Sequence, residues 1–458
     1  MIFSIDRPEP SRPALMEGAA GPTWTYGQLC AEVTRRAGAL AAPGKQLAFL
    51  LCQNDLDAVA WYLAALEAGQ PVALLAATLD AALLGELCAR YRPERVVAAA
   101  PPSADYQAGV HPGLWSRRSA APEAPPHDDL ALLLSTSGST GSPKLVRLTR
   151  KSVEANAASI AAALHIAATD VPVAHLPMHY SYGLSVLNSH LLCGAAILLT
   201  CDGLVAPGFW DMVRRRGVNS FSGVPYTYHL LRRLGLDRLK VPALTTMTQA
   251  GGKLDVDTIA HFHAALDARG GRFAVMYGQT EATARITVLP HADIPRRPGS
   301  VGRAIPGGRL SLAGPDDGEL CYHGPNVMMG YATLRADLAR GDELGGRLMT
   351  GDRARIDEDG YLYVLGRARR DAKVFGLRIN LDEVEAMVRA HGAAAVVGGE
   401  DKLVVWCEFG DAAAHEALRD ELCGRLRLHR SAFDFRRVDA LPTRDSGKID
   451  YPALAGRP

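Results

Sequence analysis

The sequence predicts an α/β protein with a large N-terminal domain of parallel-rich sheets and crossover helices, a small β subdomain, and a small α+β C-terminal domain. Up to Pro298, short apolar runs alternate with helical patterns, which is typical of parallel sheets with crossover helices. Short strand-like segments with glycine turns follow Pro298. A polar, charged segment over residues 366–371 then indicates a hinge. We expect a large domain over residues 1–366 and a small domain over residues 367–458.

The elements of the large domain follow from their hydrophobic periods, since apolar residues recur every three to four positions in a helix and form short runs in a buried strand. We expect helices over residues 25–41, 56–68, 79–91, 152–164, 182–192, 208–216 and 255–269. We expect strands over residues 46–51, 71–75, 95–100, 130–134, 171–177, 195–200, 220–225, 245–252 and 273–278, with a connecting loop over the Pro- and Ala-rich residues 101–129.

The same reasoning extends to the C-terminal part. Strand patterns cover residues 318–322 and 360–365, and a hairpin pattern covers residues 373–380. A helix is expected from Asp382, followed by a strand over residues 403–409 and a helix over residues 412–426. Three strands of the large domain end close to Gly223, Gly251 and Gly278, and open parallel sheets bind ligands beyond the carboxyl ends of their strands. These three ends are therefore expected to line one crevice.

Length and composition limit the function classes. The chain has 458 residues and a net charge of +1, so more than one domain is expected and no global charge favours nucleic acid or an acidic membrane surface. Its eight cysteines include no C-x-x-C pair and no zinc-ligand spacing, which favours a reducing compartment. The N-terminus lacks a long apolar segment, and no apolar run of about 18 residues could span a membrane. We expect a cytoplasmic protein without a nucleic-acid partner.

A loop rich in glycine and hydroxyl residues follows the strand expected over residues 130–134. It reads Thr136-Ser137-Gly138-Ser139-Thr140-Gly141-Ser142-Pro143-Lys144. Glycines let backbone N–H groups turn toward an anion, hydroxyls add donors, and Lys144 adds a positive charge. The common nucleotide loop G-x-x-x-x-G-K-[ST] is not matched. The loop is either a phosphate-binding loop or a flexible turn.

Further motifs follow this loop in a fixed order. They are Tyr277-Gly278-Gln279-Thr280-Glu281, Thr350-Gly351-Asp352, Gly366-Arg367, Lys373-Val374-Phe375-Gly376 and Pro442-Thr443-Arg444-Asp445-Ser446-Gly447-Lys448. The ordered set, spanning residues 130–448, resembles the acyl-adenylate-forming superfamily of acyl-CoA synthetases, peptide-synthetase adenylation domains and luciferases. The resemblance implies that a carboxylic acid is activated with ATP to an acyl-AMP, releasing pyrophosphate. It further implies transfer of the acyl group to a pantetheine thiol, on CoA or on a carrier protein.

The resemblance implies a role for each motif residue at the nucleotide. Thr280 would contact the α-phosphate and Glu281 would bind Mg²⁺, a hard cation suited to one carboxylate and phosphate oxygens. Tyr277 and Gly278 would lie beside the adenine, Asp352 would bind both ribose hydroxyls, and Arg367 would touch ribose or phosphate. The β- and γ-phosphates would be held by the loop residues Thr136, Ser137, Gly138, Ser139, Thr140, Gly141 and Lys144.

The C-terminal motif would supply the catalytic lysine. In the family this residue, here Lys448, bridges the carboxylate and the α-phosphate in the transition state. The small domain rotates between the two half-reactions in the family, and Gly376 would leave room for the pantetheine arm. The hinge position, which usually carries Asp or Lys, holds Arg369, and Arg370 replaces a frequent Asp.

The acid pocket is expected around residues 176–184. Adenylation domains for α-amino acids place an Asp there to pair with the substrate ammonium, and this stretch has none. A buried ammonium without a counterion is costly, so an acyl or aryl acid is favoured. His179 either gates this pocket or is a structural histidine. The same pocket would be lined by Tyr180, Gly183, Ser222, Gly223, Tyr226, Gln249 and Gly251, with Met247 nearby, as a mostly apolar slot.

Three hypotheses remain open at this point. The first is an acid–thiol ligase that makes an acyl-CoA or an acyl-carrier thioester. The second is a stand-alone adenylation domain that loads an unusual amino acid onto a separate acyl or peptidyl carrier protein. The third is a nucleotide-binding protein without catalysis. The acid, the acceptor and the oligomeric state are not fixed by the sequence.

Overall fold

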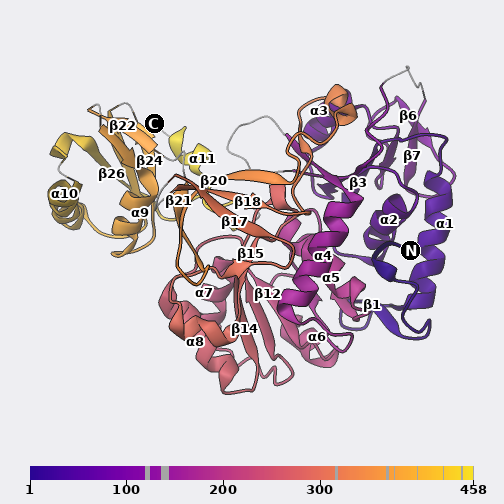
Figure 1. The fold of residues 1–458 in the computed structure, drawn as a ribbon, viewed down its shortest axis with the longest axis horizontal. Helices are drawn as coiled ribbons and strands as arrows, with labels where there is room; N and C mark the ends of the chain where they lie inside the picture. Colours follow the sequence, from indigo (N-terminus) through magenta and orange to yellow (C-terminus); the bar gives the residue numbers. More distant parts are fainter. Residues whose placement is uncertain are drawn as a thin grey trace. The chain divides into compact units, whose positions relative to one another are not determined.

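The structure is a computed structural model that describes residues 1–118, 124–135, 144–314, 318–367, 371–375, 377–399, 401–426, 428–444 and 447–456. By its packing the chain divides into two compact units (Figure 1). The first contains most of the chain up to Leu310 together with Tyr322–Leu348, and the second contains Ser311–Cys321 and Met349–Pro458. Packing thus groups residues 349–366 with the C-terminal part, while the domain boundary between residues 366 and 367 stays a prediction.

The first unit contains a mixed sheet with the strand order β19-β9-β8-β4-β3-β5-β7-β6. Its central strands β8, β4, β3 and β5 run parallel, while β9 pairs antiparallel with β8. Helices α2 and α3 connect the parallel strands, as the alternating pattern predicts. The bounds are β3 (Ala48–Cys52), α2 (Leu56–Glu67), β4 (Val72–Ala76), α3 (Ala81–Tyr91), β5 (Arg95–Val97), β6 (Tyr106–Ala108), β7 (Leu114–Arg117), β8 (Leu130–Ser135), β9 (Leu145–Thr149) and β19 (Gly330–Ala332).

A second sheet of this unit has the order β12-β13-β14-β15-β16. Strands β12, β13 and β14 are parallel neighbours, so their carboxyl ends lie along one edge. Gly223, Gly251 and Gly278 stand at or just beyond these ends, as expected. The bounds are α6 (Phe209–Arg215), β12 (Ser220–Gly223), α7 (Pro225–Leu234), β13 (Thr246–Gln249), α8 (Val256–Asp267), β14 (Arg272–Tyr277), η2 (Thr280–Ala282), β15 (Thr287–Leu289), η3 (His291–Arg296) and β16 (Arg303–Ala304).

Helices α4 (Arg150–Leu164) and α5 (Ser181–Leu192) form a layer that both sheets share (Figure 1). On one side of α5, Leu187 packs into the core of the first sheet, and on the other side Val186 packs with Met276 of β14. Because α5 is covered on both sides, nearly all of its residues are buried. Any group that α5 directs toward β12–β14 is therefore held between two well-packed layers.

The starts of several helices are fixed by side-chain caps, which satisfy backbone N–H groups that have no partner within the helix. Thr25 and Gln28 form a reciprocal capping box at the start of α1. Asp55, Thr149 and Asp255 cap α2, α4 and α8. A smaller sheet with the order β10-β11-β1-β2 completes this unit. The bounds are η1 (Ile2–Ser4), β1 (Pro13–Glu17), β2 (Thr23–Thr25), α1 (Tyr26–Leu40), β10 (Val173–Ala174), β11 (Ile197–Leu199) and η4 (Arg335–Ala339).

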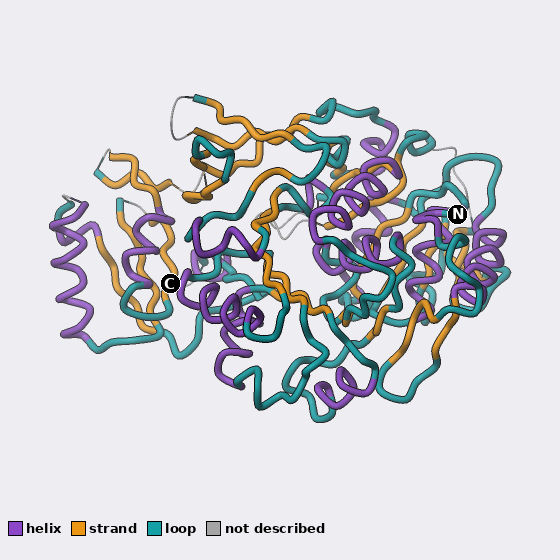
Figure 2. The backbone as a smooth tube through the Cα atoms, turned by 60° about the horizontal axis from the view of Figure 1, so that its bottom comes forward, coloured by secondary structure: helices purple, strands orange, loops and turns teal. Residues whose placement is uncertain are grey.

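The second unit contains the sheet β24-β25-β26, the hairpin β22-β23 and most residues of the sheet β17-β18-β20-β21. Its core is formed by aliphatic side chains of α9, β24, β25 and α10. Figure 2 shows helices flanking strands within each unit. The bounds are β17 (Arg309–Ala313), β18 (Gly318–His323), β20 (Arg347–Ile356), β21 (Leu362–Arg367), β22 (Asp371–Val374), β23 (Leu377–Asn380), α9 (Leu381–Arg389), β24 (Ala394–Gly399), β25 (Lys402–Cys407), α10 (Ala412–Leu426), η5 (Arg430–Ala432), β26 (Phe433–Arg437) and α11 (Tyr451–Ala455).

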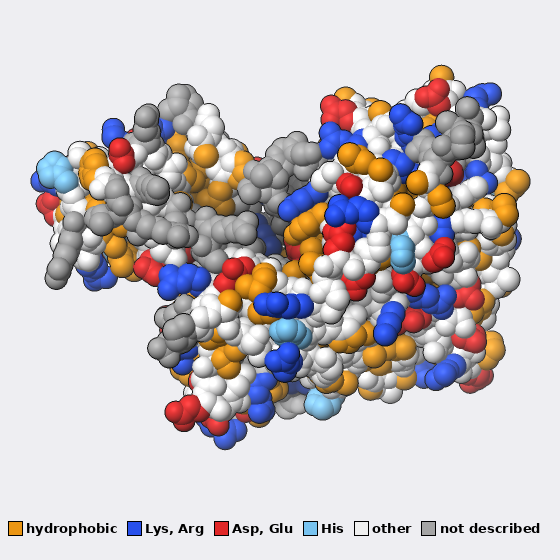
Figure 3. Space-filling model, turned by 45° about the horizontal axis from the view of Figure 1, so that its top comes forward, with side chains coloured by type: hydrophobic (Ala, Val, Ile, Leu, Met, Phe, Trp, Pro, Cys, Tyr) orange, Lys and Arg blue, Asp and Glu red, His pale blue; other side chains and the backbone are white. Residues whose placement is uncertain are grey.

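The α/β class with its parallel strands and crossover helices is confirmed. The loop expected over residues 101–129 is wrong in part, because the short strands β6 and β7 lie within it. Strands β9, β24 and β26 and helix α7 were not predicted. In the part of the chain that the structure describes, none of the helices has the length and apolarity to cross a membrane. Acidic and basic side chains are interspersed over the face drawn in Figure 3.

Candidate active site

The loop after β14 is built around Gly278. A Cβ atom at this position would lie 1.9 Å from the carbonyl oxygen of Ala284, so a side chain cannot be accommodated without moving the backbone. The absence of a side chain lets the chain fold back on itself, and Ile286 N–H donates to the carbonyl of Tyr277 at 2.9 Å. This short return brings Thr280, Glu281 and Arg285 into one compact loop.

Asn326 holds this loop in place from inside the protein. Its side-chain N–H groups donate to the carbonyls of Ala282 (2.7 Å) and Arg285 (2.8 Å), and its Oδ1 accepts from the hydroxyl of Tyr322 (2.7 Å). Asn326 is only 1 % exposed. Since buried carbonyls without partners are costly, Asn326 holds the loop at its middle and at its C-terminal end. This role could not be predicted from the sequence, because Asn326 lies 41 residues from Arg285.

Three side chains form what we call the Tyr331 cluster: Lys144, Glu281 and Tyr331. The hydroxyl of Tyr331 donates to Glu281 Oε1 at 2.7 Å. Lys144 Nζ lies 3.9 Å from the centre of the Tyr331 ring, a cation–π contact. The register of β19 with β9 places Tyr331 opposite Val146, which brings it next to Lys144. The predicted phosphate-binding lysine and the predicted metal ligand therefore meet at a residue that the sequence did not single out.

The chemistry of this cluster fits a magnesium–phosphate complex. Among the described residues no group of three or more His, Cys, Asp or Glu side chains could hold a metal ion. Glu281 offers one carboxylate, oriented by Tyr331. Mg²⁺ is commonly bound by one or two carboxylates together with phosphate oxygens and water. Residues Thr136 to Gly141 lie outside the described residues, but the strands that flank them are adjacent, since Ser135 pairs with Leu145.

Thr280 connects this loop to helix α5. Its Oγ1 lies 3.1 Å from Oγ of Ser181, the first residue of α5. Helix α5 approaches the preceding segment closely at Gly183, where a Cβ atom would lie 2.4 Å from the carbonyl oxygen of Pro177. Gly183 thus has a packing role that explains its identity. His179 lies just before α5 and is partly buried. Its gating role stays a prediction.

Several other residues predicted for the acid pocket gather at the ends of β12 and β13. The Tyr180 hydroxyl lies 2.7 Å from the position that a Cβ atom would take at Gly251. Ser222 Oγ lies 2.9 Å from Thr248 Oγ1, and buried Gln249 donates to the carbonyl of Gly252 at 2.8 Å. At Gly223 a Cβ atom would lie 2.7 Å from the methyl group of Thr227. Tyr226, by contrast, is 58 % exposed on α7.

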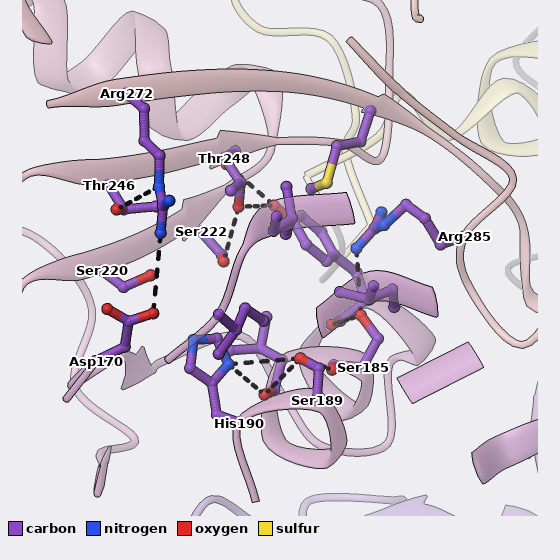
Figure 4. A pocket seen from close by; sticks show the side chains of 16 residues that line it. Asp170, Ser185, Ser189, His190, Ser220, Ser222, Thr246, Thr248, Arg272 and Arg285 are labelled. Atoms are coloured by element: carbon purple, nitrogen blue, oxygen red, sulfur yellow. Dashed lines mark hydrogen bonds and ion pairs between the residues drawn. The ribbon is translucent and has the colours of Figure 1, made fainter. Parts of the chain in front are cut away.

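A narrow cavity of about 10 Å³ lies between α5 and strands β12–β14, and we call it the α5 cavity (Figure 4). Its size corresponds to one water molecule. Apolar side chains such as Val186 and Met276 line it together with Ser185, Ser222 and Thr248. Met247 does not line the cavity, because side chains alternate along β13 and Thr246 and Thr248 face it instead. Of the residues predicted for the acid pocket, Ser222 lines this cavity, and the apolar character of the predicted pocket stays a prediction.

Three charged residues, Asp170, Arg272 and Arg285, line the α5 cavity, with Arg285 apart from the other two (Figure 4). Arg272 pairs with Asp170 at 3.9 Å and donates to Thr246 at 3.1 Å. Arg285, at 2 % exposure, donates from Nη2 to Ser185 Oγ at 3.2 Å and lies 4.8 Å from the centre of the Tyr182 ring. Burial lowers the pKa of Arg285, and the two nearby tyrosines, Tyr182 and Tyr180, oppose this shift. Arg285 was not singled out from the sequence, although its charge stands out between Ala284 and Ile286.

His190 also lines the α5 cavity. Its Nδ1 donates to the carbonyl of Val186 at 2.8 Å, one helical turn earlier, which fixes the neutral tautomer. Burial lowers its pKa to about 4, so the ring is neutral at physiological pH. It adds a polar but uncharged group to this cavity.

The predicted ribose residues lie in the second unit. Asp352 stands opposite Arg367 in the antiparallel pairing of β20 with β21. The backbone N–H of Asp352 donates to Thr350 Oγ1 at 3.2 Å, and Gly351 adopts a φ of 72° that favours glycine. The Asp352 side chain is 5 % exposed, and the side chain of Arg367 lies outside the description. The strand pairing therefore brings the two motifs together, while their contact with a nucleotide stays a prediction.

The C-terminal motif forms a tight turn in the second unit. Thr443 bridges to Ile449, and the backbone N–H of Arg444 donates to the carbonyl of Lys448 at 2.9 Å. Gly447 has a φ of 73°, which explains the glycine before Lys448. Gly376, Arg369 and Arg370 lie outside the described residues. Lys448 is partly buried, and the catalytic role of this lysine stays a prediction.

Comparison with known proteins gives consistent matches. Residues 5–332 match the family described as AMP-binding enzyme. An isonitrile lipopeptide synthase from Streptomyces coeruleorubidus is 31% identical over 95% of this chain, which spans 32% of that relative's length. A feruloyl-CoA synthase from Amycolatopsis sp is 29% identical, covering 97% of this chain and 95% of the synthase.

A solved structure shows the same fold. The O-succinylbenzoate coenzyme A synthetase MenE from Bacillus subtilis, in complex with AMP, superposes with a TM-score of 0.76 and 23% identity over 98% of this chain and 96% of that chain. The family match covers more than half of the chain and contains the loop, strand-end and glycine motifs described above. The chain belongs to the AMP-binding enzyme family, which confirms the resemblance drawn from its ordered motifs.

Proposed function

We propose that this chain activates a carboxylic acid with ATP to an acyl-AMP and then transfers the acyl group to a pantetheine thiol. The observation that carries the proposal is the Gly278–Arg285 loop. Through Glu281 the loop meets Tyr331 and Lys144, and through Thr280 it meets Ser181 at the start of α5. One rigid loop thus adjoins both a cationic cluster suited to phosphates and the start of α5, where the acid pocket is predicted.

In the first half-reaction an oxygen of the carboxylate attacks the α-phosphorus, the bond to the β-phosphate oxygen breaks, and pyrophosphate leaves. Lys144 and the loop residues Thr136 to Gly141 would hold the β- and γ-phosphates, and Thr280 would orient the α-phosphate. Glu281 would hold Mg²⁺, which when bound neutralises phosphate charge. These groups would hold the carboxylate and the triphosphate, which are both anions, in line for the attack.

Asp352 and Arg367 would hold the ribose, and Lys448 would stabilise the charge that develops between carboxylate and phosphate. In the second half-reaction the thiol sulfur attacks the acyl carbon, its proton is lost, and AMP leaves. Gly376 would admit the pantetheine arm. Relatives named feruloyl-CoA synthase, sulfoacetate–CoA ligase and oxalate–CoA ligase support CoA as the acceptor.

A second candidate is an adenylation domain that loads a carrier protein. It is favoured by the 31% identity to the isonitrile lipopeptide synthase, of which this chain spans 32%. The stretch over residues 176–184 carries no Asp, which favours an acid without an α-ammonium group in either case.

The test is pyrophosphate release by purified protein with ATP, Mg²⁺ and a panel of acids, with CoA, with a phosphopantetheinylated carrier protein, and with neither. We expect release with a subset of acids and thioester formation with one of the two acceptors. Release of pyrophosphate without thioester formation would limit the activity to adenylation. ATP binding without release for any acid would overturn the proposal and favour a non-catalytic nucleotide-binding protein.

A further inference from the structure

Arg285 differs from the other buried arginines of the chain. Among the described residues, Arg36, Arg147 and Arg335 are also buried, and each forms an ion pair with a carboxylate. Within the same described part of the chain, Arg285 forms no ion pair, and its one side-chain hydrogen bond goes to Ser185. Its Nε is buried without a hydrogen-bond partner, as are those of Arg147 and Arg335, so the missing carboxylate is what distinguishes Arg285.

The contacts that Arg285 does make bring no opposite charge to its guanidinium. Burying an ion costs several kcal/mol unless a partner of opposite charge compensates. The cation–π contact with Tyr182 contributes about 0.5–2 kcal/mol, and one hydrogen bond from a charged donor about 1.5–3 kcal/mol. A guanidinium carries five N–H donors, of which the protein uses one. The remaining donors could bind a carboxylate in bidentate fashion.

The position of Arg285 relates it to the reacting end of the acid. Arg285 contacts Ser185 on α5, and Thr280, the predicted α-phosphate residue, contacts Ser181 on the same helix. Ser181 and Ser185 are one helical turn apart, about 6 Å along the axis. Arg285 lines the α5 cavity, and in Figure 4 its guanidinium points toward that cavity. A molecule with its carboxylate near Thr280 would need only a few carbon atoms to reach it.

We propose that the acid activated by this chain carries a second anionic group, a carboxylate or another oxyanion, that pairs with Arg285 about one turn of α5 away from the reacting carboxylate. The inference deepens the proposed function and rests on it. The second anion supplies the counterion that the chain itself does not, as carboxylates do for Arg36, Arg147 and Arg335. Arg272, which lines the same cavity, already has Asp170 as its partner.

The alternative is that Arg285 only stabilises the fold by packing on Tyr182. The two readings differ in one measurable quantity, the preference for acids with a second anion. A structural role predicts a loss of stability on substitution without a change in that preference. A recognition role predicts that the preference itself reverses.

The experiment measures ATP–pyrophosphate exchange with acids matched in carbon number: succinate against butyrate, glutarate against pentanoate, and 3-sulfopropionate against propionate. For the wild type we expect kcat/KM about 10- to 100-fold higher for the dianionic member of at least one pair, the range of one charged hydrogen-bonded pair. In Arg285→Met this ratio should fall below one. Arg285→Lys keeps the charge but not the planar fork and should give an intermediate ratio. Arg233→Met, an exposed arginine on α7, should leave the ratio unchanged.

A second readout does not depend on turnover. Ligands that bind the folded state raise the melting temperature, so the preferred dianion should stabilise the wild type, in the presence of ATP analogue, more than its monoanionic partner does. This difference should be lost in Arg285→Met and reduced in Arg285→Lys. Exchange that is supported by monoanionic acids with equal or higher efficiency would overturn the inference and leave the proposed function intact. No exchange with any acid, although ATP binds, would overturn both.

Discussion

The Tyr331 cluster and the α5 cavity use charge in opposite ways. In the cluster, Lys144 and Glu281 are only partly buried and each contacts Tyr331. In the cavity, Arg285 is almost fully buried and, among the described residues, has no carboxylate partner. The first arrangement suits a large, hydrated ligand with several charges, such as a metal-bound triphosphate. The second suits a small ligand that completes a preformed charge pair.

This difference has a consequence for substitutions. Changes in the Tyr331 cluster should lower the rate for every acid by a similar factor, because the nucleotide is common to all. Changes in the α5 cavity should alter which acid is used. The predictions test this contrast, and the first concerns Lys448, which is predicted to act on both the acid and the nucleotide.

Replacing Lys448 should have the largest effect. If Lys448 stabilises charge between the carboxylate and the α-phosphate, Lys448→Ala should lower ATP–pyrophosphate exchange by at least about 10²-fold, the scale for losing one preorganised donor. The loss should be the same for all acids. Lys402→Ala, an exposed lysine of the same unit, serves as the control. Exchange retained within a few-fold of the wild type would remove Lys448 from the reaction.

Glu281→Gln tests the cluster directly. The amide keeps the shape and can still accept from Tyr331, but it loses the negative charge that Mg²⁺ prefers. We expect a decrease in exchange of about 10- to 100-fold, with more Mg²⁺ needed for half-maximal activity. Glu86→Gln, an exposed residue of α3, should have no effect. An unchanged Mg²⁺ requirement would argue that Glu281 does not hold the metal.

Tyr331→Phe should have a smaller effect. The ring remains for Lys144, but the hydroxyl that donates to Glu281 at 2.7 Å is lost. One such hydrogen bond corresponds to about 1 kcal/mol, and we expect a three- to tenfold decrease in exchange. Tyr331→Leu removes the cation–π contact as well and should decrease exchange further. Equal activities for the Phe and Leu variants would show that the ring contact with Lys144 is unimportant.

The α5 cavity should also contribute to acid sensitivity of the fold. Burial lowers the pKa of His190 from 6.5 to about 4, so between these values the unfolded chain binds a proton that the folded chain does not. Stability contributed by neutral His190 is complete above about pH 6.5 and is lost as the pH falls toward 4, by about 3 kcal/mol. Urea unfolding at pH 7 and pH 5 should show a smaller pH dependence in His190→Gln than in the wild type. An identical pH dependence would contradict the burial effect.

Much of the fold could be predicted from periodicity. Helix α10 was expected over the residues it occupies, and strands β3, β4, β8 and β14 were expected within two residues of their bounds. Their apolar runs are long enough to be recognised without context. Strands β6 and β7 are short and β26 carries three charged residues in five, so these segments become strands through pairing with neighbouring strands. Helix α7 begins at Pro225. Proline is favourable in the first turn of a helix, but in the sequence alone it is equally typical of a loop.

The residues of the candidate site also fall into those that could be predicted from the sequence and those that could not. Thr280 and Glu281 were predicted because they occur in a contiguous motif, and Lys144 because it follows a glycine-rich loop. Tyr331 and Asn326 could not be predicted, since they reach the loop only through strand register and packing from a distant part of the chain. Arg285 carried a signal that was available: it is a charged residue within an otherwise uncharged run over residues 282–289.

The close approach at Gly278 limits how this enzyme could be redesigned. A directed-evolution library aimed at new acids would naturally randomise positions around Arg285, yet any side chain introduced at residue 278 would strike a backbone oxygen, and replacing Asn326 by an apolar residue would remove its hydrogen bonds to the carbonyls of Ala282 and Arg285. Most such clones would be inactive regardless of the acid offered. Keeping these two positions invariant while varying Arg285, Ser185 and Ser222 would concentrate the library on variants that can still handle ATP.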